Sequence, residues 1–144
     1  MNSERALDQA DHFLAQGNLA EAERLYAQLA VAEPRNVIVR HRLGMIRAQR
    51  GDFSGALRWL SAALALAPNE PTMLLHHGNV LSALGRFNEA LGDYDRAIAL
   101  APDNGHAHFG RAGALYALKR VAEALEGYDK TLALKPDLAP ALNN

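Results

Sequence analysis

The chain has 144 residues, of which 49% are apolar and 22% are charged, and its formal net charge is −1. This composition is too hydrophobic for a disordered chain, and it lacks the basic excess of a nucleic-acid-binding protein. The absence of cysteine excludes disulfides, thiolate metal sites and cysteine nucleophiles. No apolar run reaches the roughly 18 residues of a membrane span, and the N-terminus lacks the pattern of a secretory signal. We therefore expect a cytoplasmic protein whose partners are neither nucleic acid nor membrane.

Prolines recur at one constant spacing along the chain: Pro34, Pro68, Pro102 and Pro136. The blocks that they mark, which align without a gap, are 3–36, 37–70, 71–104 and 105–138. Each block begins with about 14 residues of helical pattern, breaks briefly, and continues with a second helix of similar length. The proline then prevents the second helix from continuing. Since Ala and Leu, which favour helices, dominate the composition, the sequence predicts four helix-turn-helix units.

The first block shows the pattern of the second helices most clearly. Apolar residues recur there at steps of three and four: Leu19, Ala22, Leu25, Tyr26 and Leu29. Such a stripe buries one face of a helix. A small residue recurs at one place in all four second helices: Ala22, Ala56, Ala90 and Ala124. This recurrence predicts that the two helices of each block approach closely.

The second block differs from its neighbours in charge. It carries five arginines against Asp52 and Glu70, hence +3, whereas the first, third and fourth blocks carry −3, −2 and +1. The alternation predicts mild attraction between neighbouring blocks and a local positive field on the second.

The fourth block departs from the others at its break. The earlier breaks contain Gly17, Gly51 and Gly85, which close a helix in the left-handed conformation without steric cost. Lys119 stands at the equivalent place, and we expect the same conformation there at a cost of up to ~1 kcal/mol.

The last residues, 139–144, read as the opening of a fifth block that stops before its first helix is complete. We therefore expect the chain to be a fragment of a longer protein. Because an array that ends on an unfinished helix lacks a polar cap, we also expect end-to-end self-association through that open repeat.

The spacing of the small and large residues resembles the tetratricopeptide repeat, whose signature is W-x₂-L-G-x₂-Y, A-x₃-F and P. The second block reads Leu43-Gly44 followed by Ala56-x₃-Leu60, and the third reads His77-Gly78 followed by Ala90-x₃-Tyr94. The resemblance covers residues 3–138. It implies an all-α, right-handed superhelical solenoid of helix-turn-helix repeats.

The signature leucine survives only at Leu43, and Gln9, His77 and Arg111 replace it elsewhere. We expect His77 and Arg111 either to stack on each other or to reach solvent along one seam. Acidic pairs on the second helices, such as Asp93 and Asp95, are interpreted as solvated faces.

The resemblance implies a non-enzymatic scaffold that binds an extended peptide or a helix in a concave groove. No catalytic motif, cofactor motif or metal-binding motif is present, so no cofactor is expected. The alternative is the substrate-presenting region of a larger transferase, similar to O-linked N-acetylglucosamine transferases or sulfotransferases. The partner protein or peptide is not identified by the sequence.

In the family, six positions of each first helix line the groove. In blocks two to four the candidate residues for protein binding are His41, Arg42, Met45, Gln49, Thr72, His76, Asn79, Ser82, His106, Phe109 and Tyr116. A known subclass uses Lys and Asn at some of these positions to bind a C-terminal carboxylate. Because histidines stand at three of them, binding of a chaperone-type tail is disfavoured.

His41, His76 and His106 leave three interpretations open. They can be ordinary polar groove residues, they can bind an anionic peptide more tightly once protonated, or they can converge on a metal ion. Phe109 and Tyr116, which share one helix face, either anchor a peptide side chain or pack between neighbouring helices. Trp59 is interpreted as a partly exposed packing residue.

Overall fold

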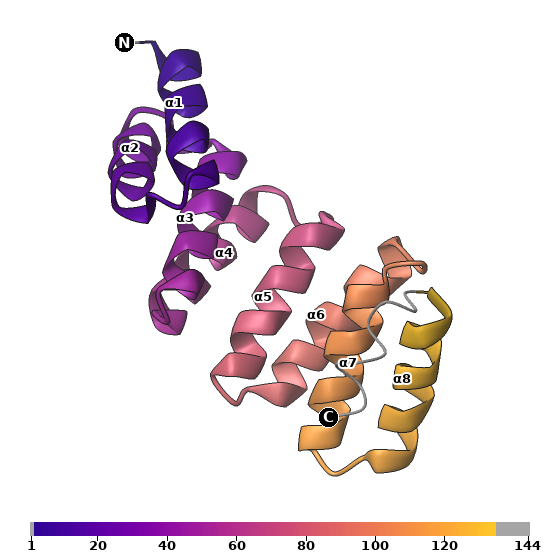
Figure 1. The fold of residues 1–144 in the computed structure, drawn as a ribbon. Coiled ribbons are helices and arrows are strands. Elements are labelled where there is room, and N and C mark those ends of the chain that lie inside the picture. Colours follow the sequence, from indigo (N-terminus) through magenta and orange to yellow (C-terminus); the bar gives the residue numbers. More distant parts are fainter. Residues whose placement is uncertain (1, 135–144) are drawn as a thin grey trace. The chain divides into compact units, whose positions relative to one another are not determined.

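The computed structural model describes residues 2–134, which form eight α-helices and contain no strand (Figure 1). The helices are α1 (Ser3–Ala15), α2 (Leu19–Ala32), α3 (Val37–Gln49), α4 (Phe53–Leu66), α5 (Pro71–Ala83), α6 (Phe87–Leu100), α7 (Gly105–Ala117) and α8 (Val121–Leu134). Each helix begins one repeat period after the corresponding helix of the preceding hairpin. The predicted all-α fold of tandem helical hairpins is therefore confirmed. Pro136 and the fifth block, 139–144, lie outside the described residues.

The chain divides into two compact units, Met1–Pro68 and Asn69–Asn144. The first contains hairpins α1–α2 and α3–α4, and the second contains α5–α6 and α7–α8. Within each unit the second hairpin packs against the first through α2 and α3, or through α6 and α7. Within residues 2–134, none of the helices combines the length and the apolar character of a membrane span.

Side chains that precede the helices fix where most of them begin. Asn2, Asn18, Asn36, Asp52 and Asn104 each accept a hydrogen bond from the backbone N–H three residues later. Such caps satisfy N–H groups that have no partner inside the helix.

The breaks between paired helices adopt the predicted left-handed backbone. Gly17, Gly51 and Gly85 have φ angles of 78°, 80° and 77°, and Lys119 has a φ of 65°. The lysine thus occupies a conformation that normally favours glycine.

Small residues allow the paired helices to meet. Ala22, Ala56, Ala90 and Ala124 are all fully buried, which confirms the expected close approach. On the facing helix α3, a Cβ atom at Gly44 would lie 2.7 Å from Cγ of Leu60. A larger residue at these crossings would push the helices apart.

The residues that replace the signature leucine in the second unit are paired with acidic groups of α6. His77 contacts Asp93 through its Nδ1 atom, and Nε of Arg111 donates to Asp95 over 2.7 Å. The expectation that these side chains reach solvent holds for Arg111, whose side chain is 32% exposed. It was wrong for His77, whose side chain is 16% exposed and is paired with Asp93. Asp93 is also not a solvated residue, since only 14% of its side chain is exposed.

Replacing Lys119 by Gly should raise the free energy of unfolding by about 0.5–1 kcal/mol, because glycine adopts a positive φ without strain. Urea unfolding followed by circular dichroism measures the change. The matched control is the reverse substitution at the equivalent turn, Gly85→Lys, which should lower stability by a similar amount. Equal stability of both variants and the parent chain would contradict this account.

Candidate functional site

A hollow of about 470 Å³ lies in the second unit between α5, α6 and α7. It is lined by Asn79, Ser82, Phe87, Tyr94, His106, Phe109, Gly110, Gly113 and Ala114. Four of these, Asn79, Ser82, His106 and Phe109, belong to the groove predicted from the sequence. The structure thus brings together residues from two successive first helices, and α6 supplies the base beneath them.

Tyr94 is the polar centre of this hollow. Its ring is 1% exposed, and its hydroxyl donates a hydrogen bond of 2.7 Å to Oδ1 of Asn79. The same hydroxyl lies 3.3 Å from Oγ of Ser82. Burial raises the pKa of Tyr94, so the hydroxyl remains a neutral donor. The bond fixes the orientation of Asn79 at the rim of the hollow.

Two glycines explain how the tyrosine ring fits between the helices. A Cβ atom at Gly110 would lie 2.5 Å from Cε1 of Tyr94, and one at Gly78 would lie 3.0 Å from the same atom. Gly110 therefore serves close packing. A Cβ at Gly113 would meet only the Tyr128 hydroxyl, at 4.0 Å, so Gly113 leaves open space in the hollow.

The aromatic candidates differ in their surroundings. Phe109 is half-buried, and its ring centroid lies 6.0 Å from that of Tyr128 at an interplanar angle of 59°. Phe109 therefore packs against α8 while it lines the hollow. Tyr116 is 61% exposed and is not among the lining residues.

The remaining candidates of the second unit lie on α5. Thr72 is exposed and His76 is half-buried. Burial lowers the pKa of His76, because desolvation disfavours the charged imidazolium. His76 would thus acquire charge only below the usual range of histidine.

In the first unit, α3 carries the other candidates. His41 is buried, Met45 is half-buried and Gln49 is exposed. Nε of Arg42 lies 3.7 Å from Oδ1 of Asp11 on α1. Arg42 therefore faces a carboxylate within its own unit.

Asp11 also accepts a hydrogen bond from the buried hydroxyl of Tyr26. Burial and the neighbouring carboxylate raise the pKa of Tyr26. This pair recurs two repeats later as Asn79 and Tyr94, because Asp11 and Asn79 occupy equivalent positions, as do Tyr26 and Tyr94. A polar residue on the first helix, followed at this spacing by a tyrosine on the second, was the sequence signal for these pairs. The residues predicted for the groove include neither Tyr26 nor Tyr94.

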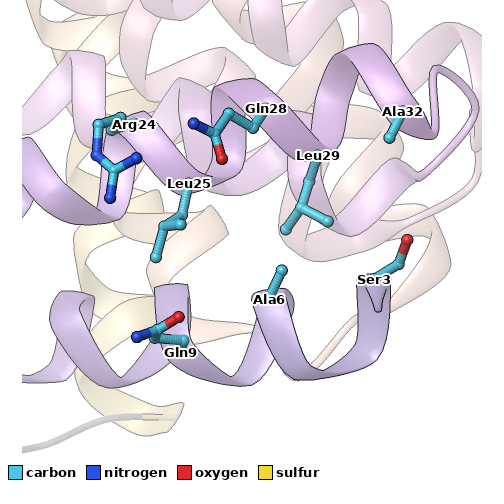
Figure 2. A pocket seen from close by; sticks show the side chains of 8 residues that line it. All are labelled: Ser3, Ala6, Gln9, Arg24, Leu25, Gln28, Leu29 and Ala32. Atoms are coloured by element: carbon cyan, nitrogen blue, oxygen red, sulfur yellow. The ribbon is translucent and has the colours of Figure 1, made fainter. Parts of the chain in front are cut away.

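A second hollow, of about 390 Å³, lies between α1 and α2 (Figure 2). Figure 2 shows Leu25 and Leu29 of α2 pointing toward Ala6 of α1. The polar side chains of Ser3, Gln9, Arg24 and Gln28 surround this apolar floor.

Among the described residues, no group of three or more His, Cys, Asp or Glu side chains is arranged to hold a metal ion. Two other histidines of the second unit contact oxygen atoms of the protein: Nε2 of His108 contacts the carbonyl oxygen of Pro102 at 2.9 Å, and His77 contacts Asp93.

A tetratricopeptide-repeat family model matches residues 7–71 and 75–139, which together cover most of the chain. The chain belongs to the tetratricopeptide repeat family. No curated protein sequence matches it.

Solved structures of MamA proteins share the fold of this tetratricopeptide repeat chain. The MSR-1 protein in a C2 crystal is 24% identical to this chain, with a TM-score of 0.83. The match covers 95% of this chain and 79% of the MSR-1 chain. The AMB-1 protein in a P212121 crystal is 25% identical, with a TM-score of 0.83, and the match covers 94% of this chain and 74% of the AMB-1 chain. Residues 41 to the end of the protein from Desulfovibrio magneticus RS-1 are 22% identical, with a TM-score of 0.87. This match covers 93% of the present chain and 76% of the RS-1 chain.

The tetratricopeptide repeat fold is generally non-catalytic, and the family match together with the shared fold supports a protein-interaction scaffold.

Replacing Tyr94 by Phe should lower the free energy of unfolding by about 1 kcal/mol, because a buried hydrogen bond is lost. The matched control is Tyr128→Phe, since no described residue bonds to the Tyr128 hydroxyl, and its effect should be within about 0.5 kcal/mol. Chemical unfolding of both variants measures the difference. Equal losses would show that the bond to Asn79 contributes nothing.

Acidification should destabilise the protein through His76. Its pKa is lowered in the folded state, so the unfolded chain binds the proton first and stability falls as the pH drops below the ordinary value of about 6.5. We expect His76→Gln to show a smaller loss of stability between pH 7 and pH 5 than the parent chain. His106→Gln, at an exposed histidine, is the control. Parallel pH profiles for the parent chain and His76→Gln would contradict the prediction.

Proposed function

We propose that the chain is a scaffold that binds an extended peptide or a helix along its first helices, and that the Tyr94 hollow receives a side chain of that ligand. The observation that supports this most directly is the hollow itself, because four predicted groove residues line it. At about 470 Å³ it lies within the range of ordinary ligand sites.

The lining of the Tyr94 hollow favours an uncharged side chain. Phe87, Phe109 and Ala114 supply apolar surface, and none of the lining residues is Asp, Glu, Lys or Arg. Asn79 and Ser82 supply polar groups, which can bond to the backbone of an extended ligand. An apolar side chain entering beside Gly113 would place its peptide group near these two residues.

His106 lies at the exposed rim of the hollow, where it offers a hydrogen bond and a flat surface to the ligand. Protonation of groove histidines remains a hypothesis about specificity. It requires that affinity for an anionic peptide rise between pH 7.5 and pH 5.5. His76 contributes less to that change, since burial lowers its pKa.

Arg42, Met45 and Gln49 remain proposed ligand contacts of the first unit, and Thr72, His76 and Tyr116 remain proposed contacts of the second. Presentation of a substrate to a transferase would use the same groove. Both roles therefore depend on occupation of the Tyr94 hollow.

Filling the hollow should abolish peptide binding. Peptides selected from a displayed random library on the parent chain should bind Gly113→Trp at least about tenfold more weakly, because the indole occupies the ligand's space. The matched control is Gly92→Trp, at an exposed glycine of α6 whose Cβ would meet nothing within 4 Å. Isothermal titration calorimetry measures both affinities. Unchanged affinity in Gly113→Trp would place recognition elsewhere.

A further inference from the structure

A third hollow, of about 360 Å³, lies between α3 and α4 of the first unit. It is lined by Arg40, Arg47, Arg58, Trp59 and Ala62. None of these residues belongs to the proposed peptide groove. Three guanidinium groups around one indole form a surface of a different chemical kind from the neutral Tyr94 hollow.

The repeats themselves show that the fold does not require these arginines. At the positions equivalent to Arg40 and Arg47, the first block has Ala6 and Phe13. The equivalent residues of the third and fourth blocks are Leu74 and Leu81, and His108 and Leu115. Apolar residues therefore satisfy the packing at most of these positions, and the second block alone carries arginine at both.

Carboxylates neutralise only part of this positive charge. Arg47 lies 2.8 Å from Oε1 of Glu23 and 3.3 Å from Oδ2 of Asp52. Arg50, beside the hollow, pairs with the other oxygen of Glu23 at 3.0 Å. These two acidic groups thus balance Arg47 and Arg50.

Arg40 and Arg58 have no such counter-charge. Nε of Arg40 donates to the carbonyl oxygen of Pro34 over 2.7 Å, which orients the guanidinium without neutralising it. Arg58 is exposed and makes no hydrogen bond or ion pair with any described residue. Nε of Arg47, moreover, is buried and has no hydrogen-bond partner among the described residues. The hollow therefore offers unused donors and an excess of positive charge.

The corresponding hollow of the first block provides an internal comparison (Figure 2). Arg24, the equivalent of Arg58, donates to Oε2 of Glu21 over 2.9 and 3.2 Å. In the second block, Gly55 stands at the position of Glu21, so the intrahelical partner is missing. The substitution leaves Arg58 available to an external anion.

Trp59 defines the apolar side of the hollow. It is half-buried and packs against the core of the first unit, so its position is fixed. A ligand that is complementary to this surface has a compact anionic group attached to a chain of atoms that can pack against the indole of Trp59.

We propose that this hollow binds the phosphate monoester of a phosphorylated peptide side chain. A phosphate carries up to two negative charges and three acceptor oxygens, which match the forked donors of Arg40 and Arg58. Arginine clusters recognise phosphorylated motifs in this way in other folds. A single compact hollow does not provide the extended basic track that a nucleic-acid strand requires.

The test uses Trp59 as its own reporter, because it is the only tryptophan of the chain. Tryptophan fluorescence is titrated with tyrosine-free peptides of one sequence that contain phosphoserine or serine. The phosphopeptide should change the fluorescence saturably, and the serine peptide should bind at least about tenfold more weakly. Arg58→Gln should weaken phosphopeptide binding at least about tenfold, whereas the matched variant Arg24→Gln should bind like the parent chain.

Both arginines are exposed, so neither variant should change the far-ultraviolet circular dichroism spectrum. Equal binding of the phosphorylated and unphosphorylated peptides would overturn the proposal, as would equal affinities of Arg58→Gln and the parent chain. Tighter binding of a single-stranded oligonucleotide than of the phosphopeptide would also overturn it. Gly113→Trp adds a second indole, so its affinity for the phosphopeptide is measured by isothermal titration calorimetry. That affinity should equal the affinity of the parent chain, which separates this site from the peptide groove.

Discussion

The close crossing of two helices within each hairpin is the constraint on which the other features depend. Ala22, Ala56, Ala90 and Ala124 are fully buried at these crossings. Because a larger side chain there would push the helices apart, the buried alanines favour a close crossing in every hairpin. That crossing decides which side chains reach across from the second helix to the first. The tyrosine hydroxyls, the arginine hollow and the neutral hollow are all consequences of it.

Much of the fold could be predicted from the sequence, because its determinants are local and recur in every repeat. Helix ends follow from caps and from glycine, and the left-handed backbone of Lys119 follows from its place in the period. The pairing of His77 with Asp93 could not be predicted, because it depends on which α6 side chain reaches α5. The expected solvation was therefore wrong for Asp93, whereas Asp95 is exposed, as predicted.

The candidate site was predictable only in part. The groove positions implied by the tetratricopeptide repeat resemblance include Asn79, Ser82, His106 and Phe109, which line one hollow. The resemblance could not identify Tyr94 or the opening at Gly113, because these depend on the volumes of side chains from three helices. Comparison of the repeats reveals these features. A polar residue of α1 or α5 accepts a hydrogen bond from a tyrosine hydroxyl, whereas Gly113 of α7 has no side chain that could bond to Tyr128.

The central claim is that the Tyr94 hollow receives the ligand. The most direct measurement is a set of intermolecular nuclear Overhauser effects between a selected peptide and the isotopically labelled chain. We predict effects from one apolar peptide side chain to the rings of Phe87 and Phe109 and to the side-chain amide of Asn79. Effects confined to residues outside α5, α6 and α7, with none to these three side chains, would contradict the claim.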